Sequence, residues 1–161
     1  MSTDSDVLEK RLAVVLRHKQ DVLDDCTLLG QRLIEHGDDL GRELISNGFA
    51  HDNSKLSGIE WLYLHPDIKE SNPELFKAAH IQHITTNRHH PEAWDGGIHS
   101  MPRVFIAEMA CDWHARSSVF GTDLWEWIKE DAIPKYKLST CGKTYKQLKD
   151  FLELLLDRKF K

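Results

Sequence analysis

His51-Asp52-Asn53-Ser54-Lys55 is the stretch around which the rest of the sequence is organised. His51 and Asp52 are adjacent residues that can both bind a metal ion, and Lys55 follows the aspartate by three positions. Asn53 and Ser54 are residues typical of turns and helix caps. We therefore expect this stretch at a helix end or in a tight turn, where its side chains can converge on a cation.

Apolar residues on both sides of this stretch recur at three- and four-residue steps, which is the spacing of amphipathic helices. The first helix is expected to begin after a cap at Asp4 or Ser5 and to end near His36-Gly37, as one long helix or two with a break. No segment shows sustained alternation of polar and apolar residues, and the sequence has no internal repeat and no linker. These features predict an all-α, single-domain helical bundle over residues 1–161.

Turn residues and prolines divide the remaining helices, and Asp38 or Asp39 is expected to cap the second one. The expected segments are a helix through Leu40, Leu44 and Ile45 stopped by Asn47-Gly48, Leu56 to Leu64 broken by Pro66, Pro73 to about Asn87, a helix opened by Pro102, a short tryptophan-containing helix capped by Thr122 or Asp123 that ends before Pro134, and Lys143 to Phe160. The apolar stripe of the last helix would either pack within the bundle or form a homo-oligomer contact.

The composition is that of an ordinary globular domain, with 40% hydrophobic and 29% charged residues. The formal net charge of -5 argues against general binding to the phosphate backbone of nucleic acids. Three cysteines without metal-type spacing indicate reduced thiols in a cytosol-like compartment. The acidic segment from Met1 to Asp6 does not resemble a signal peptide, and no apolar run approaches the roughly 18 residues of a membrane span. We expect a cytoplasmic protein without membrane or nucleic-acid partners.

Three further segments supply histidine and aspartate side chains that can join His51-Asp52. His18 lies at the edge of the buried face of the first helix. His83 belongs to a cluster of histidines, and Pro91 takes the chain out of the helix after it. Asp112 lies on a later helix. Imidazole and carboxylate groups suit Mn, Fe, Co, Ni and Zn, and helical bundles build metal sites from inward-facing side chains of this kind.

The expected ligands make a site for one or two divalent metal ions, with Mg also in the candidate set. One ion is expected at His18, His51, Asp52 and Asp112, and a second would share Asp52 and add His83 and one of His89 and His90. Two such ions would hold a hydroxide and polarise a phosphoryl oxygen. Lys55 would then bind a phosphate oxygen as a compact charge, so Lys55 and Asp52 are the expected catalytic residues.

Each of these residues also has an ordinary structural alternative. Asp52 could cap the turn that follows it, Asp112 could be a solvated helical residue, and Lys55 could be a surface lysine. Glu108 is expected to support the ligands from behind or to form an ion pair. The other histidines are expected at the surface or in loops, and the tryptophans in the core or a pocket wall: His36, His65, His99 and His114, and Trp61, Trp94, Trp113, Trp125 and Trp127.

The ordered set of His18, His51-Asp52 and Asp112 resembles the HD-domain metal-dependent phosphohydrolase superfamily, whose pattern is an isolated histidine, a His-Asp pair and a distant aspartate, all on helices. His51 to Lys55 looks like the His-Asp-x-x-Lys form of the branch with two or more metals, in which the lysine faces the substrate phosphate. The resemblance spans roughly residues 10–118. It implies an HD-like helical domain with the C-terminal helices, residues 122–160, packed on it.

The segment from His89 to Gly97 also resembles, in part, the His-His-Glu-x-x-Asp-Gly stretch of the HD-GYP cyclic-dinucleotide phosphodiesterases. It departs from that stretch because Pro91 follows the histidine pair, no Gly-Tyr-Pro follows, and His83 lies only seven residues before His90. Cyclic-dinucleotide specificity is therefore not carried over. The chain looks closer to small HD proteins of bacteria and phages, which implies the cytoplasm of a bacterium or of a phage-infected bacterial cell.

The ligand set and the resemblance together lead to the hypothesis of an enzyme, a metal-dependent phosphohydrolase acting on a nucleotide or another small phosphate ester. Two alternatives use the same residues. Some proteins of the HD superfamily hold a mixed-valence di-iron centre and act as oxygenases, and this is the second hypothesis. The third is a non-catalytic module that binds a nucleotide.

Overall fold

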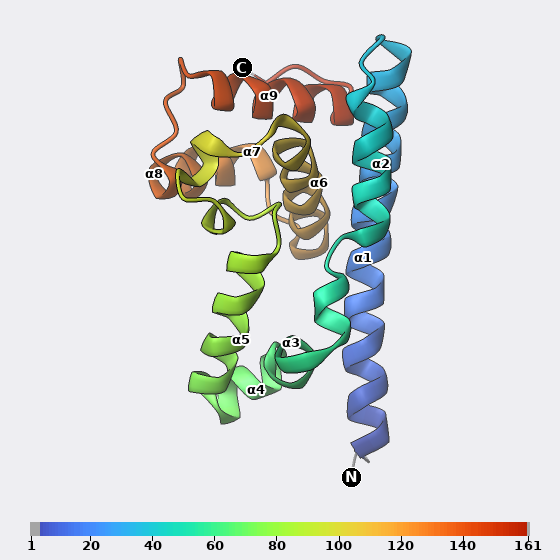
Figure 1. The fold of residues 1–161 in the computed structure, drawn as a ribbon, viewed down its shortest axis with the longest axis vertical. Helices are drawn as coiled ribbons and strands as arrows, with labels where there is room; N and C mark the ends of the chain where they lie inside the picture. Colours follow the sequence, from blue (N-terminus) through green and yellow to red (C-terminus); the bar gives the residue numbers. More distant parts are fainter. Residues whose placement is uncertain (1–3, 161) are drawn as a thin grey trace.

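The computed structural model describes residues 4–160, and every regular element in this range is a helix (Figure 1). The predicted all-α fold is confirmed. Residues 1–3 of the polar N-terminal segment, and Lys161, lie outside the described range. The elements are α1 (Asp4–Glu35), α2 (Leu40–Ala50), η1 (Asn53–Leu56), α3 (Gly58–Tyr63), α4 (Pro66–Ser71), α5 (Pro73–Thr86), η2 (Pro91–Ala93), η3 (Gly97–Ser100), α6 (Arg103–Phe120), α7 (Leu124–Trp127), η4 (Ile128–Ala132), α8 (Ile133–Tyr136) and α9 (Lys143–Leu156).

α1 is the longest element, an unbroken helix of 32 residues. It ends as predicted beside His36 and Gly37, and Gly37 adopts a positive φ of 79. One half of α1 packs along α2, and the other half extends past α2 toward α3 and α4 (Figure 1). His18 lies near its middle, so the length of α1 carries this side chain to the level of His51. No helix within residues 4–160 is both long enough and apolar enough to cross a membrane.

α1 and α2 meet at a contact between two glycines. A Cβ added to Gly41 would lie 2.1 Å from the carbonyl oxygen of Gly30, a separation that no real side chain adopts. A Cβ added to Gly48 would likewise lie 2.8 Å from the Cβ of Cys26. α2 therefore does not stop at Asn47-Gly48 as predicted but continues to Ala50, because Gly48 serves close packing rather than helix termination.

α6 forms the centre of the hydrophobic core. Almost every residue from Val104 to Ala115 is buried, and the helix packs against α1, α2 and α9. α9 lies across one end of the bundle (Figure 1) and buries Leu148, Phe151 and Leu152. Its apolar stripe therefore packs within the bundle, which is one of the two arrangements left open by the sequence.

Two prolines act differently from expectation. Pro66 ends the preceding helix as predicted, but it also opens α4, because a proline in the first turn needs no N–H partner. Pro134 does not end the helical run before it. The π-helical segment η4 precedes Pro134, and α8 continues through it to Tyr136.

Two helix boundaries also differ from expectation. The segment from Leu56 to Leu64 is divided at Ser57, with η1 on one side and α3 on the other. The last helix ends at Leu156 rather than Phe160, and Asp157 follows it with a positive φ of 50. Phe160 then folds back into the core, where its ring stacks on Trp125 with 4.2 Å between the centroids.

Replacing Gly41 with alanine is expected to destabilise the protein by about 2 kcal/mol, because the methyl group meets a backbone oxygen and overpacking outweighs the better helix propensity of alanine. Urea denaturation followed by circular dichroism measures this change in the free energy of unfolding. Ser46→Ala, on an exposed position of the same helix, should be close to neutral. A Gly41→Ala protein as stable as the wild type would contradict the close contact of α1 and α2.

Candidate metal centre

A left-handed turn directs His51 and Asp52 into the protein. α2 ends at Ala50, His51 follows as its C-cap, and Asp52 has a φ of 53 and a ψ of 24 before η1 begins. Both residues are 2% exposed. Lys19 of α1 holds the turn from outside, since its ammonium donates to the carbonyl oxygen of His51 and to Oδ1 of Asn53 at 2.7 Å. The expected position at a helix end is confirmed.

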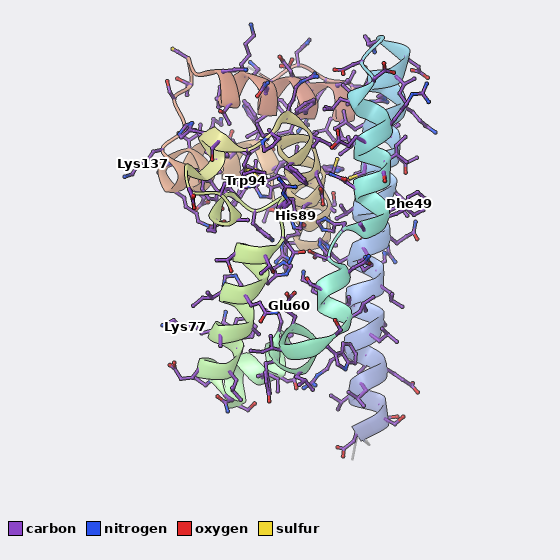
Figure 2. The ribbon with its side chains drawn as sticks, viewed as in Figure 1. Phe49, Glu60, Lys77, His89, Trp94 and Lys137 are labelled. Carbon is purple, nitrogen blue, oxygen red and sulfur yellow. The ribbon has the colours of Figure 1, made fainter. Side chains whose placement is uncertain are left out.

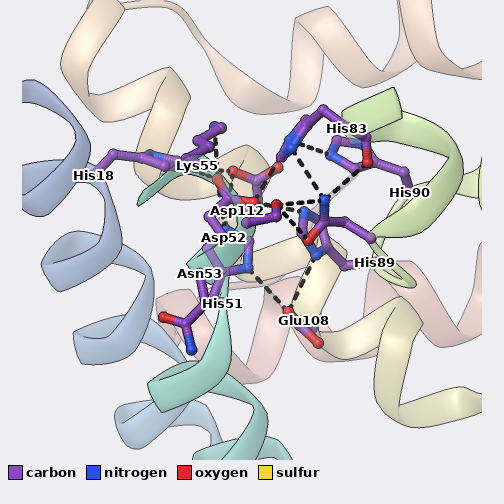
Figure 3. Close-up of polar contacts among 12 residues, drawn as sticks. His18, His51, Asp52, Asn53, Lys55, His83, His89, His90, Glu108 and Asp112 are labelled. Atoms are coloured by element: carbon purple, nitrogen blue, oxygen red, sulfur yellow. Dashed lines mark hydrogen bonds and ion pairs between the residues drawn. The ribbon is translucent and has the colours of Figure 1, made fainter. Parts of the chain in front are cut away.

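The seven side chains expected to bind metal lie together in the middle of the protein (Figure 3). They come from four parts of the chain: α1, the turn after α2, α5 with the loop that follows it, and α6. Figure 2 places His89 at this level between α5 and the α1–α2 pair, whereas Phe49 and Lys77 point outward. The residues are His18, His51, Asp52, His83, His89, His90 and Asp112.

The two carboxylate oxygens of Asp52 face two different sets of histidines. Oδ2 lies 3.5 Å from Nε2 of His18 and 3.5 Å from Nε2 of His51. Oδ1 lies 3.5 Å from Nε2 of His83 and 3.4 Å from Nε2 of His89. Asp52 therefore stands between two groups of donors, in the position that a bridging carboxylate takes.

Both groups are completed by a further side chain. Oδ1 of Asp112 lies 3.0 Å from Nε2 of His18, and Nε2 of His90 lies 3.0 Å from Nε2 of His83. Donors bound to one ion at about 2.1 Å are about 3.0–3.4 Å apart in octahedral or tetrahedral geometry. The spacing of the donor atoms therefore matches that of ligands around a shared ion. His89 and His90 both point inward, so the geometry does not favour one of them over the other as the expected ligand.

Most of these donor atoms are buried without a hydrogen bond. They are Nε2 of His18, His51 and His89, and Oδ1 of Asp52 and Asp112. Buried polar atoms are normally paired, and leaving one unpaired costs free energy. Five such atoms converging on one region indicate that these groups could hold a metal ion.

Two glutamates behind the histidines fix which ring nitrogen faces the centre. The Nδ1–H groups of His51 and His89 point at Oε1 of Glu108, at 2.9 and 3.2 Å. Nδ1–H of His83 donates to Oε2 of Glu60 at 2.8 Å. A carboxylate at Nδ1 assigns the proton to that nitrogen and leaves the Nε2 lone pair directed at the centre, as in the carboxylate–histidine pairs of metal sites. The expected supporting role of Glu108 agrees with these contacts.

Glu60 was not predicted from the sequence. It is 1% exposed, and its Oε2 also accepts a hydrogen bond from Oγ of Ser54 at 2.8 Å. Asn87 donates to the same Ser54 hydroxyl at 2.9 Å, so the network joins η1, α3 and α5. In the sequence, Glu60 does not stand three or four residues from any candidate metal ligand. A carboxylate in a short amphipathic helix also usually faces solvent. Only the packing of α3 against α5 distinguishes it from other acidic residues.

The histidines divide into two electrostatic classes. Burial lowers the pKa of His83 to about 3, and burial together with the charge of His89 lowers the pKa of His90 to about 3. Burial also opposes protonation of His18 and His89, but neighbouring carboxylates outweigh it and raise the pKa of both. His83 and His90 are therefore neutral at neutral pH, with lone pairs ready for a cation. For His18 and His89, the neighbouring carboxylates favour the protonated imidazole.

The carboxylates of the centre are ionised. Burial alone would raise the pKa of Asp52, but His51, His18 and Lys55 outweigh it and hold this pKa well below its usual range. The pKa of Asp112 is lowered in the same way. Asp52 makes no side-chain cap and Asp112 is 5% exposed, so the alternatives of a capping and a solvated residue are wrong.

Lys55 lies at the centre rather than on the open surface. Its ammonium is 2.6 Å from Oδ2 of Asp52, and its side chain is 17% exposed. The Lys55 ammonium therefore lies directly beside the donor atoms, on a side chain that keeps some exposure to solvent. The prediction that Lys55 and Asp52 belong to the same site agrees with this geometry.

The remaining histidines differ in their surroundings. His36 and His99 are exposed as expected. His65 lies in the connection between α3 and α4, which fits the expected loop position, but it is 4% exposed rather than at the surface, and its Nε2 bonds to the carbonyl oxygen of Trp61 at 2.6 Å. His114 is half-buried and bonds to Asp25 at 2.7 Å, between two surface grooves that do not reach the centre.

Four of the five tryptophans lie in or against the core, as expected, whereas Trp61 does not belong to the core cluster. Trp113 and Trp125 belong to the buried core, and Trp94 and Trp127 pack against it. Trp61 is half-buried, with its ring 5.4 Å from that of His65. None of these rings lies among the donor groups of the centre.

Comparison with known proteins gives one match. The model of a family of unknown function, DUF5662, matches residues 8–158. No curated protein and no solved structure matches the chain significantly. The matched span contains every residue of the candidate metal centre, from His18 to Asp112, and the whole of α9. The chain therefore belongs to the DUF5662 family.

Proposed function

We propose that this protein is a metal-dependent phosphohydrolase of the HD type that acts on a nucleotide or another small phosphate ester. The observation that carries the proposal is the set of five buried, unpaired donor atoms beside the ammonium of Lys55. Histidine nitrogens and carboxylate oxygens in this arrangement suit a transition metal, and an adjacent lysine suits an anionic substrate. The order of these residues along the chain supports the HD assignment.

Two divalent ions fit the division of donors around Asp52. His18, His51 and Asp112 would hold one ion with Oδ2 of Asp52, and His83, His89 and His90 would hold the other with Oδ1. The large share of imidazole donors favours Mn, Fe, Co, Ni or Zn over Mg. When bound, such ions supply an activated water and polarise the phosphoryl oxygen.

The side chains of the protein provide orientation and charge. Lys55 would neutralise a phosphate oxygen as negative charge builds up in the transition state. Asp52 keeps the ammonium of Lys55 in place through their 2.6 Å contact. Glu108 and Glu60 fix the histidine rings from behind, so the donor set is preorganised before substrate arrives.

Added Mn²⁺ or Co²⁺ is expected to raise the melting temperature by roughly 5–10 °C at a concentration 100 times the dissociation constant, because binding to the folded state contributes about 2.7 kcal/mol. Asp52→Asn and Asp112→Asn should remove most of this shift. Asp25→Asn, which alters the carboxylate paired with His114 outside the centre, is the matched control and should keep it. Differential scanning fluorimetry with and without the ion measures the effect.

The metal affinity should fall as the pH is lowered from 8 to 6. Neighbouring carboxylates outweigh burial and raise the pKa values of His18 and His89, so protons compete with an incoming ion more strongly as the pH falls. His83 and His90, with pKa values of about 3, remain neutral throughout and contribute no competition. Isothermal titration in buffers of different ionisation enthalpy measures both the affinity and the protons released. An affinity that does not change over this range would contradict the role of His18 and His89 as ligands.

Asp52→Asn is expected to lower kcat for phosphate release by about 10³-fold, and Lys55→Gln by about 10²-fold, since each removes charge stabilisation at the reacting group. The assay is release of phosphate or nucleoside from a panel of mono-, tri- and cyclic nucleotides with added Mn²⁺ or Co²⁺. Wild type and Asp52→Asn that are equally inert across this panel would refute the proposal. Stoichiometric iron with a mixed-valence EPR signal would favour the oxygenase alternative instead.

Glu60→Gln and Glu108→Gln should affect the binding of the two proposed ions differently. Among the candidate ligands Glu60 contacts His83, so its change should weaken the binding of one ion by about tenfold and leave the other in place. Glu108 contacts both His51 and His89, so its change should weaken the binding of both ions. Metal analysis after dialysis against graded metal concentrations gives the two occupancies. Equal losses in the two variants would contradict the separate roles of the glutamates.

A further inference from the structure

His89 and His90 lie between two helical elements rather than on one. Residues 87–90 form the connection from the end of α5 to the start of η2. A backbone hydrogen bond spans this connection, from the amide of His90 to the carbonyl oxygen of Asn87 at 3.0 Å. Both histidine side chains nevertheless point at the candidate metal centre. Because a regular helix sets the direction of its side chains and this connection is not one, other contacts must hold the pair in place.

Arg88, the residue before the histidine pair, is held between two aromatic rings. Its guanidinium carbon lies 4.6 Å from the ring centroid of Trp94 and 4.7 Å from that of Phe105. Both distances are within the range of cation–π attraction. The two rings are also close to each other, with 5.6 Å between their centroids, and both pack against the hydrophobic core. They therefore give the arginine a fixed surface.

Trp94 holds the main chain of Arg88 as well as its side chain. The indole Nε1–H donates to the carbonyl oxygen of Arg88 at 2.8 Å. The backbone of Trp94 is fixed in turn, since its amide donates to the carbonyl oxygen of Pro91 at 3.2 Å and its own carbonyl oxygen accepts from the amide of Gly97 at 2.8 Å. Trp94 lies at about the level of His89 (Figure 2). The peptide unit that leads into His89 is therefore held by a side chain from beyond η2.

The same connection is aligned against α6. Phe105 and Glu108 are three residues apart on this helix, so they share a face. Arg88 stacks on Phe105. His89 in turn points Nδ1–H at Oε1 of Glu108, at 3.2 Å. Two consecutive residues of the connection thus contact α6 about one turn apart, and this aligns His89 with the helix that also carries Asp112.

We propose that Arg88, Trp94 and Phe105 form a clamp that holds His89 and His90 toward the centre, which makes Arg88 a positioning residue for the second proposed ion. The inference rests on the two-ion centre of the proposed function. Arg88 acts through the backbone that it shares with the histidine pair and not as a ligand. Ligands that are held in place before an ion arrives lose less conformational freedom on binding, so the clamp raises the affinity for that ion.

The test replaces Arg88 by methionine, which keeps an aliphatic side chain and removes the charge that the rings attract. Arg88 is exposed, so the change opens no cavity in the core. Titration of Mn²⁺ into metal-free full-length protein, with free Mn²⁺ followed by EPR, gives a dissociation constant for each ion. The constant that Glu60→Gln raises identifies the second ion. Arg88→Met should weaken the binding of this ion by about fivefold and that of the first ion by less than about twofold.

Two conservative variants separate the parts of the clamp. Arg88→Lys retains a cation over the rings and should restore most of the affinity for the second ion. Trp94→Phe keeps a ring but lacks the N–H donor, and should weaken the binding of the second ion by about threefold. Arg158→Met is the matched control, because Arg158 is also exposed and its guanidinium carbon lies 4.8 Å from the ring centroid of Phe160, beyond α9. It should change neither constant.

Hydrogen exchange of the metal-free protein tests the positioning without any ion. The amides of residues 88–94 should exchange about tenfold faster in Arg88→Met than in the wild type, and at the wild-type rate in Arg158→Met. Unchanged Mn²⁺ constants in Arg88→Met, or equal losses for both ions, would overturn the clamp. A wild type that binds no Mn²⁺ would refute the proposed metal centre instead, and the exchange rates would then decide alone whether the clamp holds the histidine segment.

Discussion

The structure depends on keeping the carboxylate of Asp52 both buried and ionised. At 2% exposure an isolated carboxylate would take up a proton, because burial disfavours the charged form. His51, His18 and Lys55 prevent this and hold its pKa well below the usual range. These groups come from α1, the turn after α2, and η1, so segments distant in sequence must meet at one anion. The left-handed turn at Asp52 makes this meeting possible by directing two consecutive side chains inward.

The centre contains more acidic groups than ammonium groups. Glu60, Glu108 and Asp112 join Asp52 in the interior, whereas Lys55 and the more peripheral Lys19 are the ammonium groups beside them. Buried like charges are costly unless cations or protons offset them. The raised pKa values of His18 and His89 reflect this demand for positive charge. A divalent ion would meet the same demand while also pairing the donor atoms that lack hydrogen bonds, so electrostatics and hydrogen bonding favour the same kind of ligand.

The scaffold supports this centre through contacts that do not involve the ligands themselves. The glycine contact between α1 and α2 keeps these two helices close together, because a larger residue at Gly41 would separate them. α6 brings Glu108 and Asp112 to the centre from the middle of the hydrophobic core, where its neighbours are fully buried. Glu60, Ser54 and Asn87 connect η1, α3 and α5 by hydrogen bonds. The donor atoms are thus fixed by backbone packing and by polar contacts behind the rings.

Periodicity, caps and residue chemistry are local properties, so they were enough to predict the helical class, the end of the first helical stretch near His36-Gly37, the helix start at Pro73 and the seven candidate ligands, while leaving open whether that stretch is one helix or two. The local sequence did not predict that α2 continues through Gly48 or that the helical run continues past Pro134. Neighbouring helices and a π segment override the local preferences there. Tertiary structure alone decided that His89 and His90 both face inward, that Glu60 is buried behind His83, and that the oxygens of Asp52 face different histidines. These features depend on distances between segments far apart in the chain, which only the packing of the helices fixes.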